Sequence, residues 1–290
     1  MLYKNPILIE TYTVAKTIDK LRLSDFSAGT FTSIISRKGF KNAIKKGLVQ
    51  IDGKIGFTGD YILGGEIITI YKDKETNYKP KIQIAIEVLF EDDYLAIVNK
   101  PAGIVVSGNK KWTLENALQG NLKASSQIDA THPEPIHRLD YPTSGAVLIG
   151  KTASVVQAAN KLFEDRKIKK TYIAVTIKEM PSQGVLTSEI DNKSAKTIYK
   201  VVQTIPSPNY GFLNLVELKP HTGRKHQLRK HMSAIGNPIF GDLLYGLEGF
   251  TLKGKGLYLH AQSLKFKHPV TRENIYVEVE RPKKFGKLFD

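Results

Sequence analysis

The chain has 290 residues and a formal net charge of +15, with 43 Lys and Arg residues against 28 Asp and Glu residues. This length is enough for about two domains, and the positive charge favours a polyanionic partner, with nucleic acid preferred over an anionic membrane. The chain has no cysteine, which excludes disulfides and thiolate chemistry, and no apolar stretch approaches the roughly 18 residues of a membrane-spanning helix.

The N-terminal part of the chain shows a clear pattern from residue 38 onwards. Residues 1–29 have mixed polarity and lack the apolar core of a signal peptide, so we expect a cytoplasmic protein. Residues 38–47 predict a helix that ends at Gly47. One face of this helix is apolar, with Phe40, Ala43 and Ile44, and another carries Lys38, Lys41 and Lys45.

A small hairpin is predicted to follow this helix. Residues 48–55 contain an Asp52-Gly53 turn, and residues 66–71 predict a closing strand. A lysine-lined helix before such a hairpin resembles the S4 RNA-binding domain, and the run KKGLVQIDGK fits the KxGxVxVNGK pattern of that domain. The resemblance implies that Lys38, Lys41 and Lys45 bind RNA, whereas the alternative is a solvated helix face.

The predicted organisation is an S4-like domain, a linker and a larger domain. The first domain covers residues 1–74, with its core at about 30–72, and the charged, proline-containing linker covers 75–84. In the larger domain, residues 85–290, helices are predicted at 152–166 and 224–235. Strands are predicted at 86–91, 94–99, 145–150, 171–177, 212–218, 257–266 and 275–280, the last two as a hairpin. Strands outnumber helices, which predicts an α+β fold with a mixed, mostly antiparallel sheet.

The segment HRLDYPTSG, residues 137–145, gives the strongest indication of chemistry. Arg138 and Asp140 are two residues apart, so in an extended segment both side chains leave the same face. A carboxylate at the end of a buried strand can act as a covalent nucleophile. The alternative is a surface ion pair that contributes little free energy, and the pair by itself leaves both possibilities open.

Other sequence blocks accompany this segment in a fixed order. They are VNKPAGIVV at 98–106, KKTYIAV at 169–175, TGRKHQLRKH at 222–231, GNPIFGDLLYG at 236–246 and LHAQSLKFKHP at 259–269. This set resembles the RluA family of pseudouridine synthases over about residues 85–282, and the signatures HRLDxxTSG and TGRxHQLRxH are both complete. The resemblance implies the pseudouridine synthase fold and an isomerase that converts uridine to pseudouridine in RNA without a metal or other cofactor.

The resemblance also implies roles for three catalytic residues. Asp140 corresponds to the essential aspartate, which needs a nearby cation to stay ionised in a partly dry pocket. Arg229 is the expected partner, with Arg224 as the alternative. Tyr172 corresponds to a tyrosine on which the uracil stacks, a contact worth about 1 to 3 kcal/mol, and its hydroxyl could assist removal of the C5 proton. Without the resemblance, phosphate binding by Arg229 and a core position for Tyr172 would be equally good or better interpretations.

Arg138 and Leu228 would contact the RNA by the same resemblance. Flipping a nucleotide costs a few kcal/mol, and Arg138 would fill the vacated space; the alternative is an ion pair with Asp140. Leu228 would pack on the uracil face opposite Tyr172, or is an ordinary core leucine.

The histidines do not predict a metal site. Residues five apart on a helix lie about 140° apart on its circumference rather than on one face, and this is the spacing of His221, His226 and His231. We expect hydrogen bonds to neighbouring loops instead, from His137, His226 and His260.

Two other functions compete with the isomerase. A catalytically idle RNA-binding factor for ribosome assembly would not need the complete set of Asp140, Tyr172 and Arg229. A glycoside-type hydrolase would need a second carboxylate, for which the blocks offer only Asp242, predicted to be a turn residue. By analogy with the family, the appended S4-like domain implies ribosomal RNA, of the large subunit, rather than tRNA as the partner, and we expect a monomer.

Overall fold

The computed structural model describes residues 6–16, 18–26, 30–31, 33–34, 37–72, 82–250, 254 and 256–289. The chain divides into two compact units, residues 1–79 and 80–290. Ile82 and Ile86 are buried in the core of the second unit, so residues 82–84 belong to this unit and not to a linker. The rest of the predicted linker, residues 75–81, lies outside the described residues. No described helix is long and apolar enough to cross a membrane.

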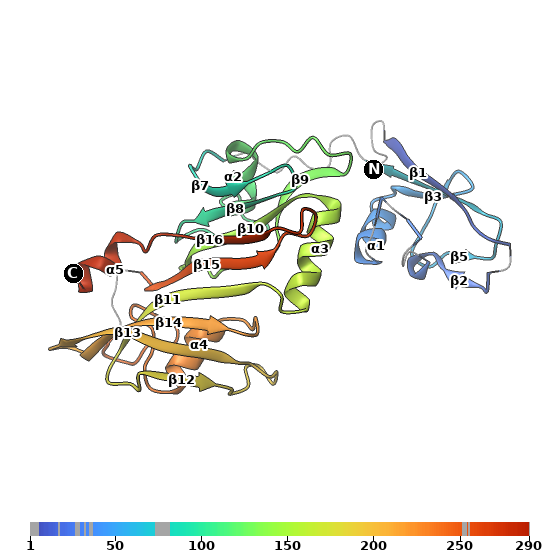
Figure 1. Cartoon of the computed structure of the whole chain (residues 1–290). Coiled ribbons are helices and arrows are strands. Elements are labelled where there is room, and N and C mark those ends of the chain that lie inside the picture. The colour runs from blue at the N-terminus through green and yellow to red at the C-terminus, as the bar shows by residue number, and fades with distance from the viewer. Residues whose placement is uncertain are drawn as a thin grey trace. The chain divides into compact units, whose positions relative to one another are not determined.

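The first unit is a four-stranded antiparallel sheet, in the order β1-β6-β3-β4, packed against helix α1 (Figure 1). The predicted helix and the Asp52-Gly53 turn are both present, and Gly47 has a positive φ of 68° after the helix. The elements are β1 (Ile7–Thr13), β2 (Leu21–Arg22), a 3₁₀ turn (Leu23–Asp25), α1 (Arg37–Lys45), β3 (Val49–Ile51), β4 (Lys54–Ile55), β5 (Tyr61–Ile62) and β6 (Ile67–Lys72).

The second unit is built on one ten-stranded sheet with the path β12-β13-β14-β11-β15-β10-β8-β7, to which β16 and β9 are added beside β15 and β10. The strands β10 and β15 are parallel and the other pairs are antiparallel, which confirms the predicted α+β fold with a mixed, mostly antiparallel sheet. The strands are β7 (Glu87–Glu91), β8 (Leu95–Lys100), β9 (Ala130–Pro135), β10 (Ser144–Thr152), β11 (Lys169–Ile177), β12 (Gln183–Leu186), β13 (Thr197–Ser207), β14 (Gly211–Pro220), β15 (Leu259–Lys267) and β16 (Asn274–Glu278).

Four helices cover the two faces of this sheet. The helix α2 (Leu114–Asn121) shares a core with one face of β8 and β10, and α3 (Ala153–Glu164) shares a core with their opposite face. The helices α4 (Gln227–Ala234) and α5 (Lys283–Phe289) cover the two faces of β11 and β14 in the same way. Burial on both faces explains why these strands are continuous apolar runs in the sequence.

The two predicted helices of this unit are present, with one corrected boundary. The Thr152 side chain caps α3 by accepting a hydrogen bond from the Val155 N–H. The helix α4 begins at Gln227 rather than at Arg224, because His226 before it has a left-handed φ of 54°. Residues 222–226 therefore form a loop, and this loop borders the site described below.

The two halves of the sheet meet at a short parallel pairing, Ser144 with His260 and Gly145 with Ala261. Gly145 has a φ of +118°, and a Cβ atom there would lie 2.2 Å from the Ala261 carbonyl oxygen and 2.6 Å from the Ala261 nitrogen. Only glycine allows this backbone conformation together with this approach. The last residue of HRLDYPTSG is therefore fixed by the junction of the sheet.

Replacing Gly145 with Ala is expected to destabilise the protein by about 3 kcal/mol or more, because the backbone of β15 must move away. Gly211→Ala is the matched control, since Gly211 also has a positive φ but a Cβ there would have no atom within 4 Å, and it should cost about 1 to 2 kcal/mol. Urea unfolding followed by the fluorescence of Trp112, the single tryptophan, measures both values. Equal losses would contradict the close approach.

Candidate active site

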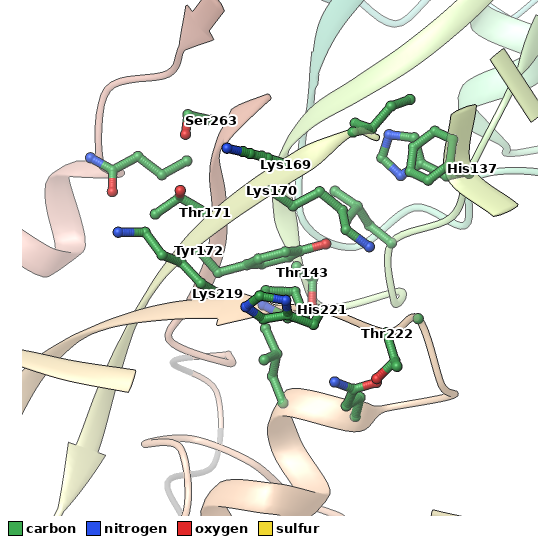
Figure 2. A pocket seen from close by; sticks show the side chains of 18 of the residues that line it. His137, Thr143, Lys169, Lys170, Thr171, Tyr172, Lys219, His221, Thr222 and Ser263 are labelled. Carbon is green, nitrogen blue, oxygen red and sulfur yellow. The ribbon is translucent and has the colours of Figure 1, made fainter. Parts of the chain in front are cut away.

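A cleft of about 1240 Å³ lies in the second unit at the junction of the two halves of the sheet (Figure 2). Its walls come from the segment before β10, the end of α3, the strands β11 and β15, and the loop between β14 and α4. All six predicted site residues of this unit line it: Arg138, Asp140, Tyr172, Arg224, Leu228 and Arg229. Segments far apart in the sequence therefore converge on one cavity.

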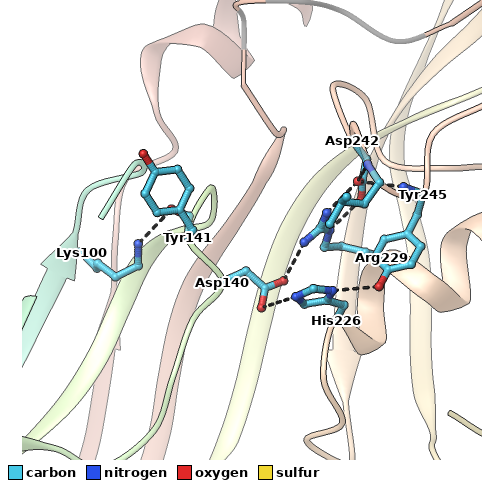
Figure 3. Close-up of polar contacts among 8 residues, drawn as sticks. Lys100, Asp140, Tyr141, His226, Arg229, Asp242 and Tyr245 are labelled. Carbon is cyan, nitrogen blue, oxygen red and sulfur yellow. Dashed lines mark hydrogen bonds and ion pairs between the residues drawn. The ribbon is translucent and has the colours of Figure 1, made fainter. Parts of the chain in front are cut away.

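Arg229 lies between two carboxylates at the base of this cleft (Figure 3). Its Nη1 donates to Asp140 Oδ2 at 3.2 Å, and its Nε and Nη2 donate to the two oxygens of Asp242 at 2.7 Å each. Arg229 and Asp242 are almost fully buried, and a bidentate pair of this kind has a fixed orientation. The guanidinium is thereby held so that its remaining edge faces Asp140.

Asp242 lies in a turn, as predicted from the sequence, and in addition it binds Arg229, which the sequence did not indicate. Burial opposes ionisation of this carboxyl, but hydrogen bonds from Arg229 and from the Leu244 and Tyr245 N–H groups hold its pKa below the usual range. Asp242 is therefore an anion whose two oxygens are both bound by Arg229. A carboxylate bound in this way is not the free acid that a glycoside hydrolase requires.

His226 is the second neighbour of Asp140. Its Nε2 lies 3.7 Å from Asp140 Oδ1, and its Nδ1 lies 2.9 Å from the Tyr245 hydroxyl. Burial lowers the pKa of His226, and this outweighs the opposing effect of Asp140, so the imidazole is neutral at pH 7. We expected His226 to hold a loop; it does so through Tyr245 and in addition it borders the carboxylate.

A tight turn presents Asp140 to the cleft. The Thr143 N–H donates to the Asp140 carbonyl at 3.0 Å, and the Tyr141 carbonyl accepts from the Gly103 N–H at 2.9 Å. Lys100 is fully buried and its ammonium donates to three carbonyl oxygens, those of Pro101 at 2.9 Å, Ile104 at 2.8 Å and Tyr141 at 3.5 Å. Through these hydrogen bonds Lys100 ties the segment 101–104 to the Asp140 turn and fixes the position of the turn.

Tyr172 and Leu228 form apolar parts of the cleft wall. Tyr172 packs against hydrophobic clusters of both halves of the sheet, and Leu228 is buried in the cluster that α4 shares with β14. Burial, and secondarily the charge of Asp140, raise the pKa of the Tyr172 hydroxyl. The phenol is therefore protonated at neutral pH and by itself is a poor base.

Two arginines of the cleft occupy different positions from Arg229. Arg138 is exposed at the cleft edge, and no ion pair joins it to Asp140 among the contacts of the described residues. Arg224 donates through Nε to the Ser194 carbonyl at 3.0 Å, so Arg229 and not Arg224 contacts Asp140.

His137 accepts from the Leu148 N–H at 3.0 Å, and burial lowers the pKa of its ring to about 3.

The predicted lysines of the first unit lie on α1. Lys41 is 4.0 Å from Asp25, and Lys45 is exposed beside a shallow depression that also contains Lys46 and Phe57. The side chain of Lys38 lies outside the described part of the chain. Among the described residues, no group of three or more His, Cys, Asp or Glu side chains is arranged to hold a metal ion.

Residues 94–234 match the family model of RNA pseudouridylate synthases. A tRNA pseudouridine synthase C of Vibrio vulnificus is 30% identical over 236 residues, which covers 71% of this chain and 94% of that protein. The chain belongs to the RNA pseudouridylate synthase family. A ribosomal large subunit pseudouridine synthase D of Xanthomonas campestris is 30% identical over 290 residues, covering 87% of this chain and 83% of that protein. The structure of human RNA pseudouridylate synthase domain containing 4 has a TM-score of 0.56 and 26% identity, covering 69% of this chain and 90% of that one.

These relatives confirm the resemblance to the RluA family. The enzyme is an isomerase that makes pseudouridine in RNA. Two residues that support its site were not identified from the sequence, Asp242 and Lys100. Both lie in sequence blocks that resemble the family, GNPIFGDLLYG and VNKPAGIVV. The sequence therefore indicated that these blocks matter, but not that Asp242 binds Arg229 or that Lys100 binds the Asp140 turn.

Acidification is expected to destabilise the enzyme through His260. This ring contacts the Ser144 hydroxyl at 2.8 Å, and burial lowers its pKa to about 4. The unfolded chain binds a proton near pH 6.5 and the folded protein does not, so stability is fully present above pH 6.5 and is lost as the pH falls towards 4.

The difference between wild type and His260→Gln measures this contribution. The free energy of unfolding of wild type should fall more steeply than that of the variant between pH 6.5 and 4, by about 2 to 3 kcal/mol in total. His221→Gln, at an exposed position, should retain the wild-type pH dependence. Parallel profiles for wild type and His260→Gln would contradict the assignment.

Proposed function

We propose that Asp140 is the catalytic carboxylate that carries out exchange of the glycosidic bond on a flipped uridine. The supporting observation is the arrangement of Asp140, Arg229 and Asp242 at the base of a cleft that also contains Tyr172. Arg229 stabilises the negative charge of Asp140, while Asp242 binds Arg229 and prevents it from turning away. The other oxygen, Asp140 Oδ1, lies 3.7 Å from His226 Nε2, beyond hydrogen-bond distance, which leaves it available for substrate in this proposal.

The reaction needs one bond broken and one bond made. The N1–C1′ bond of uridine breaks, the uracil turns, a C5–C1′ bond forms, and the proton leaves C5 while N1 becomes protonated. Asp140 either attacks C1′ as a nucleophile or stabilises the positive charge that develops there. In both cases the carboxylate must be held in a fixed orientation, and the contact with Arg229 supports this.

The cleft walls supply the other requirements of the proposed reaction. In this proposal the ring of Tyr172 stacks on the uracil, and Leu228, which lines the same cleft, packs on the opposite face of the base. Because burial keeps the Tyr172 phenol protonated, its hydroxyl acts as a hydrogen-bonding group, and it can accept the C5 proton only by passing on its own. Arg138 is exposed at the cleft edge, where it can enter the space that a flipped base leaves.

We propose ribosomal RNA of the large subunit as the substrate rather than tRNA. Residues 80–290 make up less than three quarters of the chain, so the match to the ribosomal synthase D, over 87% of the chain, must extend into the first unit. The match to the tRNA synthase C covers 71% and needs no part of that unit. The first unit is therefore shared with a relative whose name specifies ribosomal RNA.

Asp140→Asn is expected to abolish tritium release from RNA labelled at uridine C5, a loss of at least about 1000-fold in rate. The RNA should come from cells that lack this gene, and binding should remain within about threefold of wild type, because the substitution is nearly isosteric. Asp191→Asn, at an exposed position outside the cleft, is the control and should keep wild-type turnover.

Robust turnover by Asp140→Asn would contradict the catalytic assignment. Wild-type protein that binds RNA but releases no tritium would instead support an idle assembly factor. Pseudouridine mapping across ribosomal RNA and tRNA, with and without the gene, identifies the target. A site lost from tRNA alone would contradict the ribosomal proposal.

We also propose that α1 of the first unit binds the RNA backbone through Lys38, Lys41 and Lys45. Replacing all three with Gln should weaken RNA binding and flatten its salt dependence, because each lost phosphate contact removes about 0.7 to 0.9 from the log–log slope. Filter binding between low and high salt measures both quantities. An unchanged affinity and slope would show that these lysines form only a solvated face.

A further inference from the structure

Lys170 is an ammonium group inside the cleft that the proposed reaction leaves without a role. It comes from β11, two residues before Tyr172, and its side chain is partly buried. The ammonium lies 5.6 Å from the centre of the Phe163 ring and 4.0 Å from the position that a Cβ of Gly223 would occupy. It therefore extends across the cleft, from the strand towards the loop before α4.

The other cations of the cleft have partners or lie in solvent. Arg229 binds two carboxylates, and Lys219 lies 2.6 Å from Glu217. Lys170 makes no ion pair or hydrogen bond within the described part of the chain, and burial is what lowers its pKa. Partial burial of a cation without a counterion costs free energy that an anion would offset. The position of Lys170 thus indicates an anion-binding point within the substrate cleft.

We infer that Lys170 binds a backbone phosphate next to the flipped uridine, an inference that rests on the proposed function. The ammonium of Lys170 points into the cleft from the same strand as Tyr172 (Figure 2). Residues i and i+2 of a strand share one face and are separated by about 6.6 Å. The pairing of β11 with β14 begins at Tyr172, and the pairing with β15, which includes Lys170, shifts register between Thr171 and Tyr172. Both side chains nevertheless line the same cleft.

This spacing matches the extent of a single nucleotide. With the uracil on the Tyr172 ring and C1′ at Asp140, the sugar carries its phosphate away from the base along the cleft wall. Lys170 occupies that wall, and Gly223 opposite has no side chain to fill the gap. Lys170 is thus a binding residue that fixes the flipped nucleotide by its phosphate, while Asp140 acts on the sugar.

The first test compares RNA affinities in a protein that cannot turn over its substrate. Every variant carries Asp140→Asn. The probe is the stem-loop of ribosomal RNA or tRNA that the Asp140→Asn protein binds most tightly. The choice of probe therefore does not depend on activity. Lys170→Met should raise Kd about tenfold and lower the salt slope by about one contact. Lys170→Arg, which keeps the charge, should restore most of the affinity.

The control is Lys200→Met, an exposed lysine on β13 outside the cleft, which should bind as wild type does. The decisive test removes the charge of one RNA phosphate at a time by methylphosphonate substitution. At one phosphate beside the flipped uridine, neutralisation should cost the Lys170-containing protein about tenfold and cost Lys170→Met almost nothing. Coupling at a single position is what a direct contact produces.

If neutralising each phosphate weakened binding by the same factor with Lys170 as with Lys170→Met, the inference would be overturned. An unchanged Kd for Lys170→Met would also overturn it. Coupling without tritium release by the otherwise wild-type enzyme would overturn the proposed function while supporting the phosphate contact. In the active enzyme, Lys170→Met should raise KM more than it lowers kcat, because Lys170 does not touch the reacting atoms. A loss confined to kcat would place Lys170 in the chemical step and contradict this role.

Discussion

The site depends on one buried cation held between two carboxylates. Arg229 comes from α4, Asp242 from the loop that follows it, and Asp140 from the turn before β10, in the other half of the sheet. Removing one member of a buried ionic group leaves an uncompensated charge, which costs more than the intact group contributes. The same contacts that orient Asp140 therefore also join the two halves of the domain.

The sheet junction supplies the backbone framework for this ionic group. Gly145 allows β10 and β15 to approach closely, and the contact between Ser144 and His260 fixes the same point. Immediately before this junction the chain turns at Asp140, and the Lys100 ammonium donates to the Tyr141 carbonyl of this turn. The position of one carboxylate is thus determined by backbone contacts on several sides, and this preorganisation supports the proposed catalytic role of Asp140.

The basic character of the chain is distributed between two tasks. In the second unit, cations line the cleft in which the proposed chemistry takes place. In the first unit, the lysines of α1 are proposed to bind the RNA backbone, where they would add affinity without acting on the reacting atoms. A substrate that is a folded polyanion gives a physical reason for both.

From the sequence, the class of fold and the family could be predicted, and Asp140, Tyr172 and Arg229 were predicted as a set that the structure brings to one cleft. Periodicity located the buried strands and the core of α3, because burial on both faces leaves an apolar run and a helical stripe leaves a 3.6-residue period. It missed β13 (Thr197–Ser207), much of whose length is exposed, and it extended α4 to Arg224, because a left-handed residue such as His226 has no periodic signature.

The tertiary structure alone decided which of these groups meet. Arg229 rather than Arg224 reaches Asp140, Asp242 binds Arg229, and Lys170 has no counterion among the described residues. All three depend on contacts between residues far apart in the chain. Local patterns encode which face of an element is buried. They do not encode distances between side chains on different elements, because packing sets those distances.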